Sequence, residues 1–345
     1  MDRIRGFQFP ILCFLILSVL GFSACGRMDL RKVPEAKTRT AFGLDTVVSI
    51  TYYDEKDRAS VDRAIGSLDH YSKIFSRKDP ESELSAVNRS RGIAIPVSED
   101  LFNVLKTAWD LSAKTDGAFD CTLGALSDLY GFTGERHVPS DEERNELLSH
   151  AGYEKVVLDE ENRTVTRLDA GAVIDLGAIA KGYIADKLKE ELLNAGVRRA
   201  IVNLGGNVQL IGNKYGESGE VFSTGAADGL FTIGIKNPDS ETPLTKLYLA
   251  DLSVVTSGTY ERCFYDEGVL YHHILDAETG LPVRNGLLSV SIVSRESMKA
   301  DALSTALFVL GEEGAEKLLL NDPDVRAIFA YEDGRLSTVR PASPD

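Results

Sequence analysis

One β-rich run follows another through residues 199 to 294, and this order constrains the fold more than any other feature of the chain. The segment RAIVNLGGNVQLIG (199–212) holds two strand-like halves around a pair of glycines. Further runs of this kind are FTIGIKNP, KLYLADLSVVTSG, VLYHHILD and LLSVSIVS. Neighbouring strands with helices in separate groups favour an α+β fold, with largely antiparallel sheets and packed helices, over a regular βαβ array.

Apolar residues recur at helical spacing elsewhere in the chain. The segments with this spacing are 61–76, 101–115, 179–196 and 297–321. Gly196 ends the third helix and Gly311 interrupts the fourth. Residues 155–169 are typical of a hairpin across a polar turn. No clear linker divides residues 41 to 340, so we expect one compact unit.

The first 25 residues carry the features of an export signal. Arg3 and Arg5 precede the apolar run FPILCFLILSVLGF, which is shorter than a membrane-spanning helix requires. Small residues and Cys25 follow, an arrangement similar to a bacterial lipoprotein signal that is cut before a lipidated cysteine. An ordinary secretory signal with a chance cysteine is the alternative. We therefore expect an exported protein anchored to a bacterial membrane, with a signal peptide over 1–24, a lipidated cysteine and polar tether over 25–40, and a folded domain over 41–345.

The charge and the cysteines exclude some functions and leave one question open. Acidic residues outnumber basic ones by 53 to 38. This excess argues against a nucleic-acid partner, because phosphate contacts need clustered Lys and Arg. Cys121 and Cys263 lie in the exported part, where a disulfide is permitted, but the sequence does not say whether they pair.

The stretch DLGAIAKGY (175–183) joins a strand to a helix through a glycine. A helix start offers free backbone N–H groups, which suit a phosphate. Lys181 falls in the first turn, where a cation opposes the helix dipole and can serve an anionic ligand. The alternative is an ordinary strand–helix turn with a solvated lysine.

The stretch ADALSTAL (300–307) places a carboxylate and a hydroxyl on one helix face, because Asp301 and Thr305 are four residues apart. Both groups are hard oxygen donors of the kind that Mg²⁺ accepts. Burying Asp301 among alanines and leucines without a partner would be costly. A helix cap at Asp301 with a core-facing threonine is an equally open interpretation.

Other polar stretches are weaker signals by themselves. YHHILDAETGLPV (271–283) holds two adjacent histidines before a carboxylate, and a hydrogen-bonded strand histidine is the simpler explanation of either one. TDGAFDCTLG (115–124) places Asp116 and Asp120 after a helix, around a glycine that could end that helix. LGGN (204–207) could let a ligand approach the backbone or could form a bulge.

Taken together and in this order, the stretches resemble the ApbE family of FAD:protein FMN transferases, over most of residues 41 to 320. They are SRKDPESELSAVN, TDGAFDCTLGALSDLYGF, IDLGAIAKGYIAD, IVNLGGNVQLIG, VVTSGTYER, YHHILDAETGLPV and ADALSTALFVLG. The resemblance implies a T-fold-related architecture and a reaction in which FAD and Mg²⁺ bind and FMN passes to a threonine or serine of a partner protein, with release of AMP. It also implies that the partner is an exported or membrane-bound electron-transfer flavoprotein subunit.

The resemblance assigns roles to individual residues. Asp301, Thr305 and the backbone carbonyl of Ala178 match the metal-binding positions, and His273 matches a histidine that assists the transfer. The residues that match FAD-contacting positions are Leu44, Ala118, Phe119, Asp120, Asp175, Lys181 and Ile274. Three positions depart from the family pattern: Leu44–Asp45–Thr46 stands for Met–Gly–Thr, Asn207 for the acid of Gly–Gly–Asp, and Ala277 for the proline of Asp–Pro.

With these roles, His273 is expected to take the proton of the acceptor hydroxyl as a general base with a pKa near neutrality. His272 is expected to orient the strand or to face solvent. Backbone N–H groups of residues 178–182 are expected to hold phosphate. Two alternatives remain: an FAD pyrophosphatase that gives FMN and AMP, and a non-catalytic FAD-binding lipoprotein.

Overall fold

The computed structural model describes residues 33–340, and its central element is an eight-stranded sheet in which every neighbouring pair of strands is antiparallel. In spatial order its strands are β1 (Lys37–Gly43), β2 (Thr46–Tyr52), β6 (Ala200–Leu204), β7 (Asn207–Ile211), β11 (Ser253–Gly258), β14 (Leu287–Ser294), β15 (Arg326–Tyr331) and β16 (Leu336–Val339). The prediction of an α+β fold with antiparallel sheets is confirmed.

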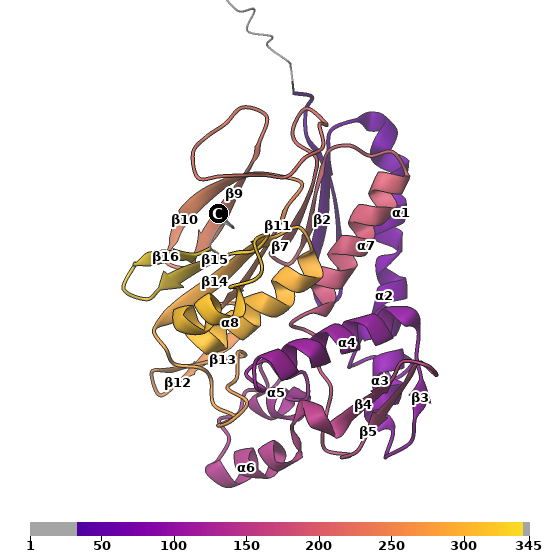
Figure 1. Ribbon diagram of the computed structural model, residues 1–345, viewed down its shortest axis with the longest axis vertical. Helices are drawn as coiled ribbons and strands as arrows, with labels where there is room; N and C mark the ends of the chain where they lie inside the picture. The colour runs from indigo at the N-terminus through magenta and orange to yellow at the C-terminus, as the bar shows by residue number, and fades with distance from the viewer. Residues whose placement is uncertain (1–32, 341–345) are drawn as a thin grey trace, which may run out of the picture. The chain divides into compact units, whose positions relative to one another are not determined.

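Both faces of this sheet are covered, which explains why β14 is buried along almost its whole length. The helices α7 (Ala180–Asn194) and α8 (Ser297–Leu318) lie across one face (Figure 1). A three-stranded sheet of β8 (Val221–Ser223), β10 (Ser240–Ala250) and β9 (Phe231–Asn237) packs on the other. Two adjacent residues of β11 point to opposite faces of the large sheet. Val255 packs in the core between this sheet and the helices, and Val254 packs in the core between this sheet and the three-stranded sheet.

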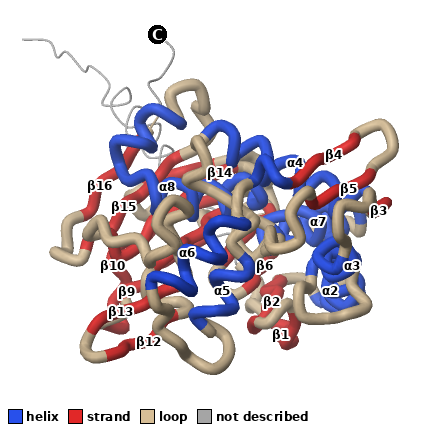
Figure 2. The backbone as a smooth tube through the Cα atoms, turned by 90° about the horizontal axis from the view of Figure 1, so that it is seen from below, coloured by secondary structure: helices blue, strands red, loops and turns tan. Residues whose placement is uncertain are grey.

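The remaining helices and strands include α1 (Arg58–Gly66), which packs along β1, β2 and α7, and a group of elements at the lower end of the large sheet in Figure 1. The helices are α1, α2 (Leu68–Phe75), α3 (Glu83–Arg89), α4 (Glu99–Lys114), α5 (Gly124–Tyr130) and α6 (Asp141–His150), with short 3₁₀ turns at Glu55–Asp57 and Tyr153–Lys155. The strands are β3 (Ile95–Pro96), β4 (Val156–Asp159), β5 (Thr164–Arg167), β12 (Cys263–Asp266) and β13 (Val269–His272). Figure 2 shows α5 and α6 from below, in front of the large sheet.

The helical segments and the 155–169 hairpin occur where the sequence predicted them, except that 61–76 is divided between α1 and α2. Gly311 interrupts α8 with a φ of 70°. The fold begins earlier than expected, because β1 starts at Lys37, inside the predicted tether. The described residues from Pro34 onward form one unit by their contacts. The predicted signal peptide and Cys25 lie outside the described residues. Within the described part of the chain, every helix is too short or too polar to cross a membrane.

Candidate active site

A cavity of about 410 Å³ lies where the β1–β2 turn, the loop after α4, the start of α7 and the first half of α8 meet. Most of the residues singled out from the sequence line it. They are Ala118, Phe119, Asp120, Asp175, Ala178, Lys181, His273, Ile274, Asp301 and Thr305. The fold thus brings stretches that are far apart in the sequence to one place.

The contact between α7 and α8 positions Asp301. Gly182 lies against the start of α8 so closely that a Cβ atom there would be 2.3 Å from the Ser297 carbonyl oxygen. Its backbone N–H donates to Asp301 Oδ2 at 2.8 Å. Asp186, one turn further along α7, accepts the N–H groups of Ser297 and Met298, each at 2.8 Å, and so caps α8. The alternative role of Asp301 as a helix cap is therefore wrong, because Asp301 lies inside α8 and a residue of another helix caps it.

Asp301 is only 4% exposed, and burial raises the pKa of its carboxyl group. Lys181 opposes this shift, with its Nζ atom 3.7 Å from Asp301 Oδ1. Lys181 compensates only part of the cost of burying the negative charge of Asp301, so a bound cation would stabilise this carboxylate further.

The Thr305 hydroxyl lines the same cavity and lies 3.0 Å from Ser257 Oγ. Asp301 and Ala178 line this cavity too, and a carboxylate, a hydroxyl and a backbone carbonyl are oxygen ligands of the kind that Mg²⁺ accepts. Between residues 33 and 340, no three His, Cys, Asp or Glu side chains gather as a metal site. A single carboxylate still fits Mg²⁺, because this ion is usually held by one or two carboxylates together with substrate phosphates.

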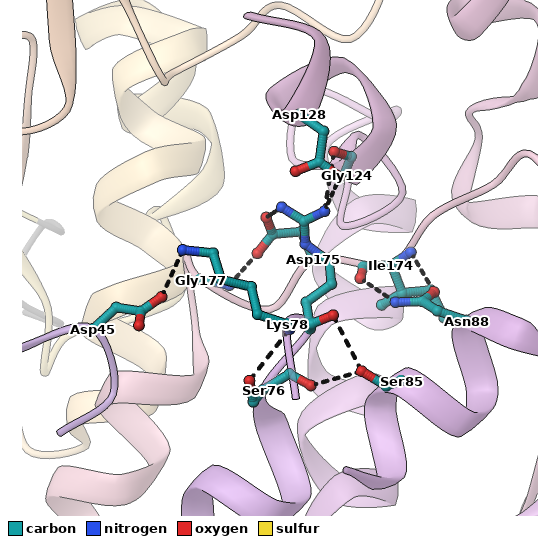
Figure 3. A network of polar contacts seen from close by, with 11 residues as sticks. Asp45, Ser76, Lys78, Ser85, Asn88, Gly124, Asp128, Ile174, Asp175 and Gly177 are labelled. Carbon is teal, nitrogen blue, oxygen red and sulfur yellow. Dashed lines mark hydrogen bonds and ion pairs between the residues drawn. The ribbon is translucent and has the colours of Figure 1, made fainter. Parts of the chain in front are cut away.

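Asp175 is held in a polar network that fixes the loop before α7 (Figure 3). Arg77 bridges Asp175, at 3.2 Å, and Asp128 of α5. The other oxygen of Asp175 accepts the N–H of Gly177 at 2.8 Å. Asn88 binds both backbone groups of Ile174, each at 2.8 Å. Asp175 therefore shapes the cavity wall as well as lining it.

Asp120 has a similar double role in the loop after α4. One of its oxygens accepts the backbone N–H and the hydroxyl of Thr122, both at 2.7 Å. The other accepts the N–H of Tyr153 at 3.0 Å. Burial raises the pKa of Asp120, while these hydrogen bonds act in the opposite direction. The helix α4 ends at Lys114, and the chain turns away from it at Gly117, whose φ of 81° lies in the left-handed region.

The two histidines lie in different surroundings. His272 is buried, its Nε2 atom lies 3.0 Å from the carbonyl oxygen of Val283, and it is absent from the cavity wall. His273 lines the cavity, and its Nδ1 atom is buried without a hydrogen-bond partner among the described residues. The expected pKa near neutrality is wrong for this state, because burial, reinforced by Arg262, lowers the pKa of His273 to about 3.

Two further expectations need correction. Leu44 packs against the hydrophobic core, and the next residues of the turn, Asp45 and Thr46, line the cavity instead. The helix start is a poor phosphate cradle, because several of its N–H groups already have acceptors. Those of Ile179 and Ala180 bond to the carbonyl of Leu176, and that of Gly182 bonds to Asp301.

Some lining residues were not predicted from the sequence. Phe132 and Thr133 follow α5, a helix that no periodic pattern indicated. Glu261 and Arg262 lie in VVTSGTYER, a stretch that contributed to the resemblance without a role for either residue. Glu261 and Arg262 directly precede the β12–β13 hairpin, and His273 directly follows it. This position is the sequence feature that could have indicated a place near His273.

The protein has an α+β fold with one cavity that gathers a buried carboxylate, a lysine and a histidine from distant segments. The chain belongs to the ApbE family, whose model matches residues 44–329. The FAD:protein FMN transferase of Treponema pallidum is 35% identical over 336 residues, which cover 93% of this chain and 91% of that protein. The enzyme of the same name from Klebsiella pneumoniae is 35% identical over 80% of this chain and 84% of its own length.

Solved structures agree with this assignment. The crystal structure of the ApbE protein of Thermotoga maritima has a TM-score of 0.79 and 35% identity, and the match covers 89% of this chain and 97% of that one. The flavin transferase ApbE from Vibrio cholerae has a TM-score of 0.75 at 26% identity, over 90% of this chain and 98% of that one.

Proposed function

We propose that the chain is an FAD:protein FMN transferase that moves FMN from FAD to a threonine or serine hydroxyl of a target flavoprotein, with Mg²⁺ as cofactor and AMP as the leaving group. The observation that carries this proposal is the meeting of Lys181, His273 and Asp301, from three distant segments, in one cavity. Relatives that carry this activity in their names match most of the chain and support it.

Asp301, Thr305 and the Ala178 carbonyl are the groups that would hold Mg²⁺. When bound, this ion would supply charge neutralisation at the pyrophosphate. Lys181 adds a second positive charge, and its Nζ atom is fixed by the carbonyl of Gly177 at 2.7 Å. The cavity therefore offers positive charge at one place, where the negative charge of a phosphoryl-transfer transition state would develop.

His273 is the group that would take the proton from the acceptor. Its lowered pKa keeps the ring neutral at physiological pH, so it can accept a proton. The negative charge of a bound pyrophosphate would raise this pKa toward the working range. The acceptor oxygen forms a bond to the FMN phosphorus, the bond from that phosphorus to the AMP oxygen breaks, and the acceptor proton passes to His273.

We also propose that the acceptor is an exported or membrane-bound electron-transfer subunit and that Cys25 carries a lipid anchor. The apolar run before Cys25 and the family membership support this assignment.

The test is intact mass spectrometry of a candidate acceptor subunit after incubation with the protein, FAD and Mg²⁺. The expected result is an FMN adduct that requires Mg²⁺ and is lost in Asp301→Asn. Asp110→Asn, a change of the same kind outside the cavity, should leave the adduct unchanged. Free FMN and AMP from FAD, with no adduct on any exported flavoprotein subunit, would establish a pyrophosphatase instead, and bound but unaltered FAD would establish a carrier.

A further inference from the structure

Asn207, at the start of β7, is a buried polar side chain in the cavity wall to which the mechanism above gives no role. It is only 1% exposed. Its Oδ1 atom accepts the hydroxyl of Ser297 at 2.6 Å, and Ser253 donates to that hydroxyl at 2.9 Å. In this arrangement the amide oxygen is tied to α8, and Nδ2 is the free end of the side chain.

The other end of the amide has no such partner. Its Nδ2 atom is buried and makes no hydrogen bond among the described residues. The carboxyl group of Asp301 lies near Nδ2, but at a geometry short of a normal hydrogen bond. A buried N–H donor without an acceptor is unfavourable, and such donors usually find one in a ligand or an ordered water.

The surroundings of Nδ2 restrict the kind of ligand. Lys181 and the oxygens of Asp301 and Thr305 lie in the same cavity, so a group bound here meets an ammonium ion and a cation site together. An oxygen that accepts a hydrogen bond and carries negative charge fits this place, and a phosphate oxygen has both properties.

We propose that Asn207 Nδ2 donates a hydrogen bond to an anionic oxygen of the pyrophosphate group of the substrate. The inference rests on the proposed function for the identity of that substrate as FAD. An aspartate at this position would accept instead of donate and would add a second negative charge beside Asp301. The amide therefore lets the cavity bind a pyrophosphate before a divalent cation arrives, which two neighbouring carboxylates would oppose.

The experiment is calorimetric titration of the full-length protein with FAD, and separately with inorganic pyrophosphate, in EDTA. Asn207→Ala removes the donor, and Asn207→Asp replaces it with a negative charge while keeping an acceptor for Ser297. The matched control is Asn203→Asp in β6, which adds the same charge outside the cavity and keeps an acceptor for the N–H of Gly206.

Loss of a hydrogen bond to a charged group should weaken the binding of both ligands by roughly ten- to a hundredfold in Asn207→Ala. Asn207→Asp should weaken it further, and Asn203→Asp should bind like the wild type. Unchanged affinity in either variant of Asn207 would overturn the proposal. Should Asn207→Ala fail to fold, Asn207→Asp decides, because it preserves the bond that holds the side chain.

Binding of Mn²⁺ to the FAD-free protein separates a lost donor from a distorted cavity. The extra carboxylate of Asn207→Asp should keep or raise the Mn²⁺ affinity, and a loss of Mn²⁺ binding would show distortion and overturn the assignment. Because none of these readouts uses the acceptor protein, the inference can fail while FMN transfer holds, or hold while transfer fails.

Discussion

Replacing Gly182 with alanine tests the close contact between α7 and α8. The added Cβ atom would lie 2.3 Å from the carbonyl oxygen of Ser297 and 2.6 Å from the Cα atom of Met298. Both are backbone atoms, so no side-chain rotation relieves the clash and the two helices must separate. Overpacking of this kind lowers the free energy of unfolding by about 1–3 kcal/mol.

The same movement would reach the cavity. The backbone N–H of Gly182 holds Asp301 Oδ2 at 2.8 Å, so a displaced α7 also displaces this carboxylate relative to Lys181. A shift of about 1 Å in catalytic geometry can lower a rate by about a hundredfold. We therefore expect Gly182→Ala to lose both stability and FMN transfer.

Urea denaturation measures the first effect, and the rate of appearance of the FMN adduct by mass spectrometry measures the second. The control is Gly66→Ala at the end of α1, where an added Cβ would meet no atom within 4 Å. Because alanine favours a helix more than glycine does, this control should gain up to about 1 kcal/mol and keep its activity. A Gly182→Ala protein with wild-type stability and wild-type transfer would refute the reasoning.

Other changes test separate parts of the structure. His273→Ala should slow transfer at least about a hundredfold, the scale of a lost general base, with little change in the Kd for FAD, and an equal loss of both would show a binding role instead. Burial lowers the pKa of His272 from 6.5 to about 4, so the neutral ring stabilises the fold fully above pH 6.5 and this contribution is lost as the pH falls toward 4. Urea denaturation should therefore show a steeper loss of stability on acidification in the wild type than in His272→Gln, and parallel curves would contradict this. Cys121 and Cys263 are both free thiols in the structure, so peptide mapping without reductant should recover them unlinked. Cys25→Ser should release the protein from the membrane fraction, and continued retention would reject the lipid anchor.

Local patterns in the sequence were sufficient to predict much of the fold. The antiparallel order follows from strand runs that are adjacent in the chain, as in β6 and β7, which pair across the turn at Gly205 and Gly206. The exposed helix α6 lacks buried residues, so it has no apolar stripe from which periodicity could predict it. The sequence predicts a tether as far as residue 40 because this stretch is polar and lacks periodicity, and only its pairing with β2 makes Lys37–Gly43 a strand.

The composition of the site was predictable from motifs, but its electrostatics depended on packing between distant segments. Asp301 and Thr305 share a helix face by spacing alone. The cap that Asp186 provides to α8 joins residues more than a hundred positions apart, and no local pattern indicates it. The lowered pKa of His273 likewise arises from burial and from Arg262, on the preceding strand connection.

The most direct test of the central claim is an anomalous diffraction map of the protein crystallised with Mn²⁺ and ADP, which carries the pyrophosphate of FAD without the flavin. The account predicts one strong peak bonded to Asp301, Thr305 and the carbonyl oxygen of Ala178, with pyrophosphate oxygens completing the coordination. A peak outside this cavity, or a pyrophosphate bound away from Lys181 and Asp301, would contradict it.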